Sequence, residues 1–187
     1  MNTYTLEEYK EAVRFLASTH RNFDIKNEGN EHARIVLTNL FLNAKKEVRI
    51  VANTLRNEVV DSREYQDALD SFLGRVGAKL QIIINQLPDN ANEEIITNIY
   101  RRLRLNPAYE EGRIVIKVAG ENRFFLGKKP VNLCVADSLM YRIEDDIEKR
   151  TAVCNFGNAK KAAGLEAGFD NVFSSIREVV DLKKLFA

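Results

Sequence analysis

The sequence predicts an α/β fold in which a mixed β-sheet carries helices on both faces. Short β-branched runs alternate with longer amphipathic segments in the middle of the chain, and further β-branched runs cluster late. With 187 residues, 45% of them hydrophobic and 29% charged, the composition is typical of a globular protein that can bury one full core. We find no internal repeat, low-complexity tract or linker that would divide the chain.

The N-terminal part predicts two helices joined by a polar connector. Residues 5–20 repeat apolar side chains at helical spacing behind a capping threonine. Residues 22–30 are polar and turn-like, and residues 31–45 carry a second apolar helical face. We therefore expect residues 1–30 to form a helix and connector that pack on a main domain of residues 31–187.

The rest of the chain predicts strands at short apolar, β-branched runs and helices at longer amphipathic ones. The expected strands are residues 47–52, 79–85, 113–118, 131–135, 139–143 and 151–155. The expected helices are residues 62–74, 93–105 and a long C-terminal segment, 159–186.

An ordered set of polar residues accompanies the late strands. Pro130, Asn132 and Asp137 lie on or beside one expected strand, and Asn155 ends the last one. This pattern resembles the signature of the phospholipase D superfamily, in which a strand carries His-x-Lys-x-x-x-x-Asp and the next carries Gly-Ser-x-Asn. Asp137 and Asn155 match that signature, whereas Pro130 stands at its histidine position and Asn132 at its lysine position.

The resemblance covers roughly residues 33–178 and implies a fold similar to one half of a phospholipase D-like protein. In active relatives the histidine attacks phosphorus, the lysine binds the phosphate, and two copies of the motif meet at a two-fold axis. A chain with one copy therefore implies a homodimer. Proline offers no nucleophile and asparagine no charge, so the resemblance implies a degenerate and catalytically inactive motif.

A second hypothesis is that the chain is an enzyme with a non-standard active site. Arg142 and Glu144 alternate along one expected strand and therefore point to the same face. Arg142 could bind an anion while Glu144 acts as acid or base, or the two could form an ion pair within the sheet. The candidate catalytic residues are Asp137, Arg142 and Glu144. The candidate ligand-binding residues are Asn132, Asp137, Arg142 and Asn155.

The densest basic patch is formed by Arg101, Arg102 and Arg104 beside Tyr100. These arginines could contact the phosphates of a nucleic acid, but positive charge is also favoured at the C-terminus of any helix. The formal net charge of +1 gives no global attraction to nucleic acid or to an anionic membrane.

The sequence predicts neither a metal site nor a cofactor. The only two histidines, His20 and His32, precede the first strand of the main domain, and their expected role is at helix ends. Cys134 and Cys154 lie in apolar runs, which predicts buried, reduced thiols; if their strands are neighbours, a redox role becomes testable. No apolar run is long enough for a membrane span, and we expect a cytoplasmic protein.

Two functions follow as hypotheses. The first is a non-catalytic phospholipase D-like module that dimerises and binds a protein or nucleic acid, within a bacterial defence or mobile-element system. The alternative is a nuclease or phosphodiesterase whose site gathers around Asp137, Arg142, Glu144 and Asn155. The two differ in one outcome, which is whether these side chains meet in a pocket.

Overall fold

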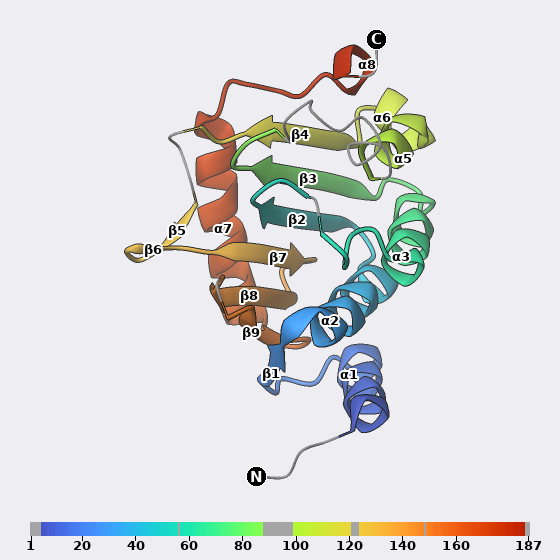
Figure 1. Cartoon of the computed structure of the whole chain (residues 1–187), viewed down its shortest axis with the longest axis vertical. Helices are drawn as coiled ribbons and strands as arrows, with labels where there is room; N and C mark the ends of the chain where they lie inside the picture. The colour runs from blue at the N-terminus through green and yellow to red at the C-terminus, as the bar shows by residue number, and fades with distance from the viewer. Residues whose placement is uncertain (1–4, 56, 88–98, 121–123, 148, 186–187) are drawn as a thin grey trace.

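A seven-stranded mixed sheet forms the centre of the molecule (Figure 1). The computed structural model describes residues 5–55, 57–87, 99–120, 124–147 and 149–185. The strands of this sheet are β1 (Ile25–Glu28), β2 (Glu47–Ala52), β3 (Lys79–Ile84), β4 (Ile114–Val118), β7 (Asn132–Ala136), β8 (Met140–Asp146) and β9 (Thr151–Asn155). Their order is β1-β9-β8-β7-β2-β3-β4, with β2, β3 and β4 parallel and every other neighbouring pair antiparallel.

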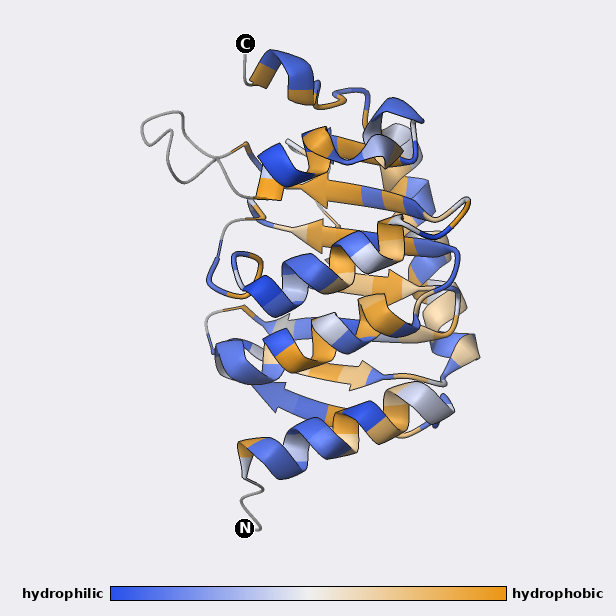
Figure 2. Cartoon of the chain, turned by 90° about the vertical axis from the view of Figure 1, so that its right-hand side faces the viewer, coloured by the Kyte–Doolittle hydropathy of each residue, from blue (hydrophilic) through white to orange (hydrophobic). Residues whose placement is uncertain are grey.

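Helices cover both faces of this sheet, which confirms the predicted fold class. One face carries α1 (Leu6–Thr19), α2 (Gly29–Asn43), α3 (Arg63–Leu73) and α5 (Ile99–Leu105), all seen in front of the sheet in Figure 2. The opposite face carries α7 (Ala159–Ser175), which crosses the strands in Figure 1. The short helices α6 (Pro107–Glu110) and α8 (Leu182–Leu185) lie near the β4 edge, and β5 (Phe125–Leu126) pairs with β6 (Lys129–Pro130) in a separate hairpin.

Each face of the sheet has its own apolar core. Alternate residues of a strand point to opposite faces, so β2 sends Val48 and Ile50 toward α2 and α3 but Val51 toward α7. On the α7 side, Phe169 and Phe173 stack at 5.3 Å between ring centroids. The parallel strand β3 is buried on both faces, as its continuous apolar run predicts.

Local sequence signals set the helix starts. Thr5 and Glu8 form a reciprocal capping box at the start of α1. The Ser62 side chain accepts a hydrogen bond from the Tyr65 N–H at the start of α3. The expected helix over residues 62–74 and the strands over 47–52, 79–85 and 151–155 are therefore found within a residue or so of their predicted limits. Of the expected helix over residues 93–105, residues 93–98 lie outside the described residues and residues 99–105 form α5.

The polar connector was predicted wrongly as a turn. Residues 25–28 form β1, which pairs antiparallel with β9 and places Ile25 opposite Cys154. Pairing with an existing sheet edge outweighs the low strand propensity of Asn27 and Glu28. The buried Tyr9, Val13 and Ala17 of α1 join the same core as α2.

The long C-terminal helix was also predicted wrongly. α7 ends at Ser175, and the chain then runs extended along β4, where the Val180 N–H donates to the Ile116 carbonyl at 2.8 Å. The Val118 N–H donates in turn to the Glu178 carbonyl at 3.1 Å. Ile176, Val179 and Val180 are β-branched, so hydrogen bonding to the open edge of β4 is favoured over another helical turn.

Candidate functional site

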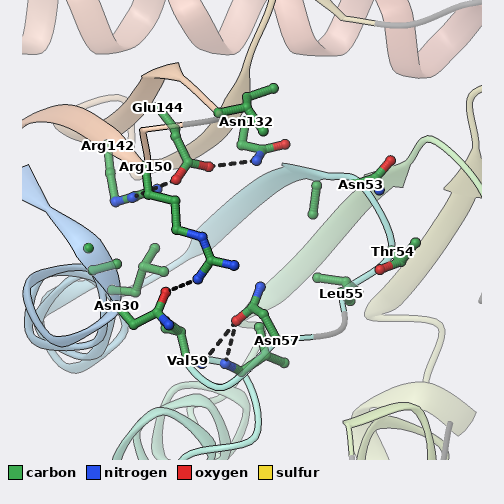
Figure 3. A pocket seen from close by; sticks show the side chains of 16 residues that line it. Asn30, Asn53, Thr54, Leu55, Asn57, Val59, Asn132, Arg142, Glu144 and Arg150 are labelled. Carbon is green, nitrogen blue, oxygen red and sulfur yellow. Dashed lines mark hydrogen bonds and ion pairs between the residues drawn. The ribbon is translucent and has the colours of Figure 1, made fainter. Parts of the chain in front are cut away.

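A pocket of about 220 Å³ opens where the end of β2, the start of β7 and the end of β8 meet the first turn of α2 (Figure 3). β2 runs antiparallel to β7, which is in turn antiparallel to β8, so these three strand ends lie at the same side of the sheet. The polar residues that line the pocket are Asn30, Asn53, Thr54, Asn57, Asn132, Arg142, Glu144 and Arg150.

One wall of the pocket is a hydrogen-bonded network around Glu144. The Asn132 side chain donates to one Glu144 oxygen at 2.6 Å, and Arg142 Nη2 approaches the other at 3.3 Å. Arg142 Nε donates to the side-chain oxygen of Asn27 at 3.0 Å. The side chains of Arg142 and Glu144 are only 7% and 12% exposed. The buried charge of Arg142 is therefore paired with that of Glu144, and the hydrogen bonds hold both side chains in place.

The opposite side of the pocket is closed by Arg150. Its guanidinium reaches across the opening and donates to the side-chain oxygen of Asn30, as Figure 3 shows. The Asn30 amide nitrogen donates onward to Glu58 at 2.7 Å. In the described part of the chain Arg150 makes no ion pair, whereas Arg142 is already neutralised by Glu144.

The floor of the pocket is shaped by the segment after β2. The side-chain oxygen of Asn57 accepts hydrogen bonds from the Val59 and Val60 N–H groups, each at 3.0 Å, and so fixes the turn. Among the described residues that line the pocket, Thr54 brings the only hydroxyl group, and none is a histidine, lysine or cysteine. The pocket can therefore bind an anion through Arg150 and amide groups, but it holds no strong nucleophile.

The structure brings together only part of the predicted site. Asn132, Arg142 and Glu144 meet in the pocket, and the expectation that Arg142 and Glu144 share a face is confirmed. Asp137 and Asn155 lie elsewhere, so the four ligand-binding candidates do not form one cluster.

Asp137 lies at the far end of β7, where it holds a turn. Its carboxylate accepts hydrogen bonds from the Lys45, Lys46 and Glu47 N–H groups at 2.5, 2.9 and 2.9 Å. These donors join the end of α2 to the start of β2. Asp137 itself has a φ of +53°, within the β7–β8 hairpin turn. Its geometry supports a scaffold role rather than contact with a pocket ligand.

Asn155 faces the opposite side of the sheet. Its amide nitrogen donates to Asp24 at 2.8 Å, and Asp24 also accepts from the Tyr141 hydroxyl at 2.9 Å. Tyr141 belongs to the core under α7, and Lys161 of α7 lies 4.9 Å from its ring centroid. The hydrogen bond from Asn155 is the largest cause of a lowered pKa at Asp24.

Pro130, at the motif's histidine position, lies in β6 and is exposed. It pairs with Phe125 of β5 in the hairpin that projects from the body of the molecule in Figure 1. The pocket begins two residues later, with Asn132.

The candidate nucleic-acid residues lie on α5, away from the pocket. Arg102 is held by acidic residues of α3, with Nε 2.7 Å from Asp70 and Nη2 3.1 Å from Asp67. These carboxylates raise the pKa of Arg102 and neutralise its charge. Arg104 is partly buried, whereas Arg101 is exposed.

The two cysteines are buried and cannot form a disulfide in this fold. Cys134 on β7 and Cys154 on β9 both lie opposite Arg142 of β8, one on each side of it. Two strand spacings of about 4.8 Å separate their backbones by roughly 9.6 Å, beyond the reach of a disulfide bond. Burial raises the pKa of each thiol to about 12, which favours the protonated and less reactive form at neutral pH.

His32 points away from the pocket although it belongs to the same turn of α2 as Asn30. It stacks on Tyr9 at 3.8 Å, and its Nδ1 accepts from the Glu28 N–H at 3.4 Å. Burial lowers the pKa of His32, so its neutral form is favoured. Within the described residues, no group of three or more histidine, cysteine or acidic side chains is arranged to hold a metal ion.

Sequence reasoning missed Arg150, Asn30, Asn53 and Asn57. Arg150 follows the acidic end of β8, and the basic pair Lys149-Arg150 was the only signal it gave. The asparagines lie in segments that read as ordinary turns, because their approach to β8 depends on the strand order.

Structural comparison identifies the fold. Nuc from Salmonella typhimurium, a phospholipase D family member, superposes with a TM-score of 0.58 at 13% identity, over 84% of this chain and 98% of that one. NucT from Helicobacter pylori superposes with a TM-score of 0.57 at 13% identity, over 84% and 99% of the two chains. The chain has a phospholipase D-like fold.

A DNA-binding protein is also among the structures similar to this chain. TrmBL2, an archaeal chromatin protein with a novel mode of DNA binding, superposes with a TM-score of 0.56 at 13% identity over 92% of this chain. The present chain spans 62% of the length of TrmBL2. Neither a protein-family model nor a curated protein sequence matches the chain. No helix in the described ranges is long and apolar enough to cross a membrane.

Proposed function

We propose that this protein is a phospholipase D-like module that binds a phosphate group of a nucleic acid in its pocket without cleaving it. The observation that carries the proposal is the pairing of charges at the pocket. Arg142 is neutralised by Glu144, whereas Arg150 spans the opening with only a neutral amide, Asn30, as its partner in the described structure. A guanidinium of this kind is suited to phosphate.

The size and polarity of the pocket support a small anionic group. A volume of about 220 Å³ is below the roughly 300–1,000 Å³ of pockets that enclose drug-sized molecules. Asn53, Thr54 and Asn57 surround the opening with side chains that can donate or accept hydrogen bonds. DNA binding by TrmBL2, which shares the fold, favours a nucleic acid as the source of the phosphate.

The absence of cleavage follows from the chemistry of the lining. Phosphodiester transfer in this fold requires a nucleophile and a cation on the reacting phosphate. Asn132 can donate a hydrogen bond but carries no charge, and it is already bonded to Glu144. The described residues that line the pocket include no histidine or lysine that could remove the proton of Thr54.

We further propose that the protein acts as a homodimer. Ile147 lies at the rim of the pocket and is 43% exposed. Packing against a partner would bury it and close the open side of the pocket. The setting we propose is the cytoplasm, within a bacterial defence or mobile-element system.

The test measures binding and turnover on the same protein. A fluorescein-labelled 12-nucleotide single strand is titrated with wild-type chain, Arg150→Ala and two control variants, Arg14→Ala on α1 and Arg101→Ala on α5. We expect the dissociation constant to rise about tenfold in Arg150→Ala, because a charge-assisted hydrogen bond is lost, and to change little in Arg14→Ala. A larger effect of Arg101→Ala would move nucleic-acid binding to α5 and contradict the pocket assignment.

Turnover separates the two hypotheses. We expect no hydrolysis of DNA, RNA or bis-p-nitrophenyl phosphate with or without Mg²⁺. Hydrolysis that Glu144→Gln abolishes would instead support the phosphodiesterase alternative, with Glu144 as its acid or base. Sedimentation of the wild type and of Ile147→Asp tests the dimer, which Ile147→Asp should dissociate.

A further inference from the structure

The outer edge of β1 is a strand edge that no described strand covers. β1 is the last strand on its side of the sheet, paired only with β9. The Gly29 N–H donates to the Arg150 carbonyl at 3.2 Å. Because the direction of hydrogen bonding alternates along an antiparallel strand, the backbone groups of Ile25 and Asn27 also face β9. Those of Lys26 and Glu28 therefore face outward.

Glu28 provides an independent check on this alternation. Its N–H points away from β9 and donates to the Nδ1 of His32, at 3.4 Å. The donor and acceptor of Lys26 remain directed outward, at a sheet edge. Unpaired backbone groups of this kind are a template for another strand.

Beside this edge lies a groove of about 770 Å³. One side is β1, and the other is α1, which continues the helical layer past the level of β1 in Figures 1 and 2. The side of α1 that faces the groove carries Ala12, Phe15 and Leu16. Phe15 is 56% exposed and Phe23, just before β1, is 61% exposed, so an apolar surface is left uncovered.

At the other edge of the sheet, an extended segment already pairs with the edge strand β4. There, residues 176–181 of the chain itself run along β4 in an extended conformation, with Val180 bonded to Ile116 and Lys117 bridged to Val179. No described segment does the same for β1. A volume of about 770 Å³ fits an extended segment, with each residue advancing about 3.3 Å.

We infer that the β1 edge binds an extended peptide segment of a partner protein, which adds to the sheet as an eighth strand beneath α1. Backbone hydrogen bonds to Lys26 hold the segment, as in other cases of strand addition. Alternate apolar side chains of the segment contact Phe15 and Leu16. Its remaining side chains lie on the other face, where Lys26 and Glu28 favour one acidic and one basic residue opposite them.

A second copy of this chain is excluded as the strand by the position of α1. Two β1 strands related by a two-fold axis perpendicular to the sheet would bring both α1 helices to the same strip above the shared edge. α1 already occupies that strip in one copy (Figure 2).

The test selects a phage-displayed library of random nine-residue peptides on the wild-type protein and then compares variants. Lys26→Pro removes the outward N–H, and the sheet loses no bond because that donor faces away from β9. Lys26→Ala is the matched control, since it removes the charge and keeps the backbone donor. Phe15→Asp changes an exposed residue on the helix side of the groove. Thermal unfolding and circular dichroism establish that all three variants are folded.

We expect enriched peptides that alternate apolar and polar residues. Fluorescence anisotropy of the strongest one should show binding weakened at least about tenfold by Lys26→Pro and Phe15→Asp, and at most about threefold by Lys26→Ala. Failure to enrich peptides, or equal binding to Lys26→Pro, would overturn the inference. A dimer in sedimentation that Lys26→Pro dissociates would also overturn it, by assigning the edge to a second copy.

Discussion

The two ends of β7 differ in what their polar residues do. At one end Asn132 faces a pocket and shares Glu144 with Arg142. At the other end Asp137 accepts three backbone hydrogen bonds and joins the β7–β8 turn to the start of β2. On this strand the sequence resembles the phospholipase D signature at Asp137, which supports the fold, and departs from it at Asn132, which lines the pocket. One strand of a phospholipase D-like fold therefore has a scaffold residue at one end and a pocket residue at the other.

The largest effect is expected at the Asp137 end. Asp137→Ala leaves three backbone N–H groups without their acceptor. Each bond is charge-assisted, but the two from Lys45 and Lys46 are exposed and only the one from Glu47 is partly buried, so we expect the free energy of unfolding to fall by about 3 kcal/mol. Chemical denaturation measures this. The control is Asp181→Ala, whose carboxylate accepts two N–H groups at the start of α8 and should cost about 1 kcal/mol. Equal losses in the two variants would contradict a scaffold role for Asp137.

At the pocket end the expected effect is smaller in stability and depends on which partner is removed. Glu144→Ala leaves the buried guanidinium of Arg142 without a countercharge, a change that costs roughly 3–5 kcal/mol in a fully buried pair. Arg142 keeps its hydrogen bond to Asn27, so we expect a smaller loss of stability, of about 2 kcal/mol. Asn132→Ala removes a neutral donor and should cost about 1 kcal/mol. The double variant Arg142→Met with Glu144→Leu should recover most of the loss. If Glu144→Ala leaves the free energy of unfolding unchanged, the Arg142–Glu144 ion pair does not stabilise the fold.

The face opposite the pocket gives a pH-dependent contrast. The hydrogen bond from Asn155 lowers the pKa of Asp24 below its ordinary value of 3.8 in the folded state. The stability that Asp24 contributes is therefore complete above about pH 4 and is lost as the pH falls further. We expect urea denaturation midpoints of the wild type to fall between pH 4 and pH 2, and Asn155→Ala to reduce the part of that fall caused by Asp24. If the fall in the urea midpoint with pH is the same in Asn155→Ala as in the wild type, the hydrogen bond from Asn155 is not what lowers the pKa of Asp24.

The sequence predicts the sheet well because its strands are short apolar runs whose pattern does not depend on distant contacts. It fails at β1 and at residues 176–181, where polar or mixed segments become extended only because an open sheet edge lies beside them. The same reason explains the candidate site. The alternation of Arg142 and Glu144 is local and was predicted correctly, whereas the separation of Asn155 from Asn132 depends on which face each strand presents. Arg150 reaches the pocket because it lies in the turn that connects β8 to β9, and no local sequence pattern predicts where that turn lies relative to α2.

The smallest effect is expected from restoring the signature. Asn132→Lys places a cation next to Glu144, which will form an ion pair with it rather than leave it free for phosphate. Pro130→His places the imidazole on an exposed hairpin, outside the pocket lining. We therefore expect no hydrolysis of bis-p-nitrophenyl phosphate by either variant or by the double variant, each checked for folding by circular dichroism. Turnover by the double variant alone would show that β6 can reach the pocket. It would also show that the side chains at positions 130 and 132 are enough to decide whether this end of β7 is catalytic.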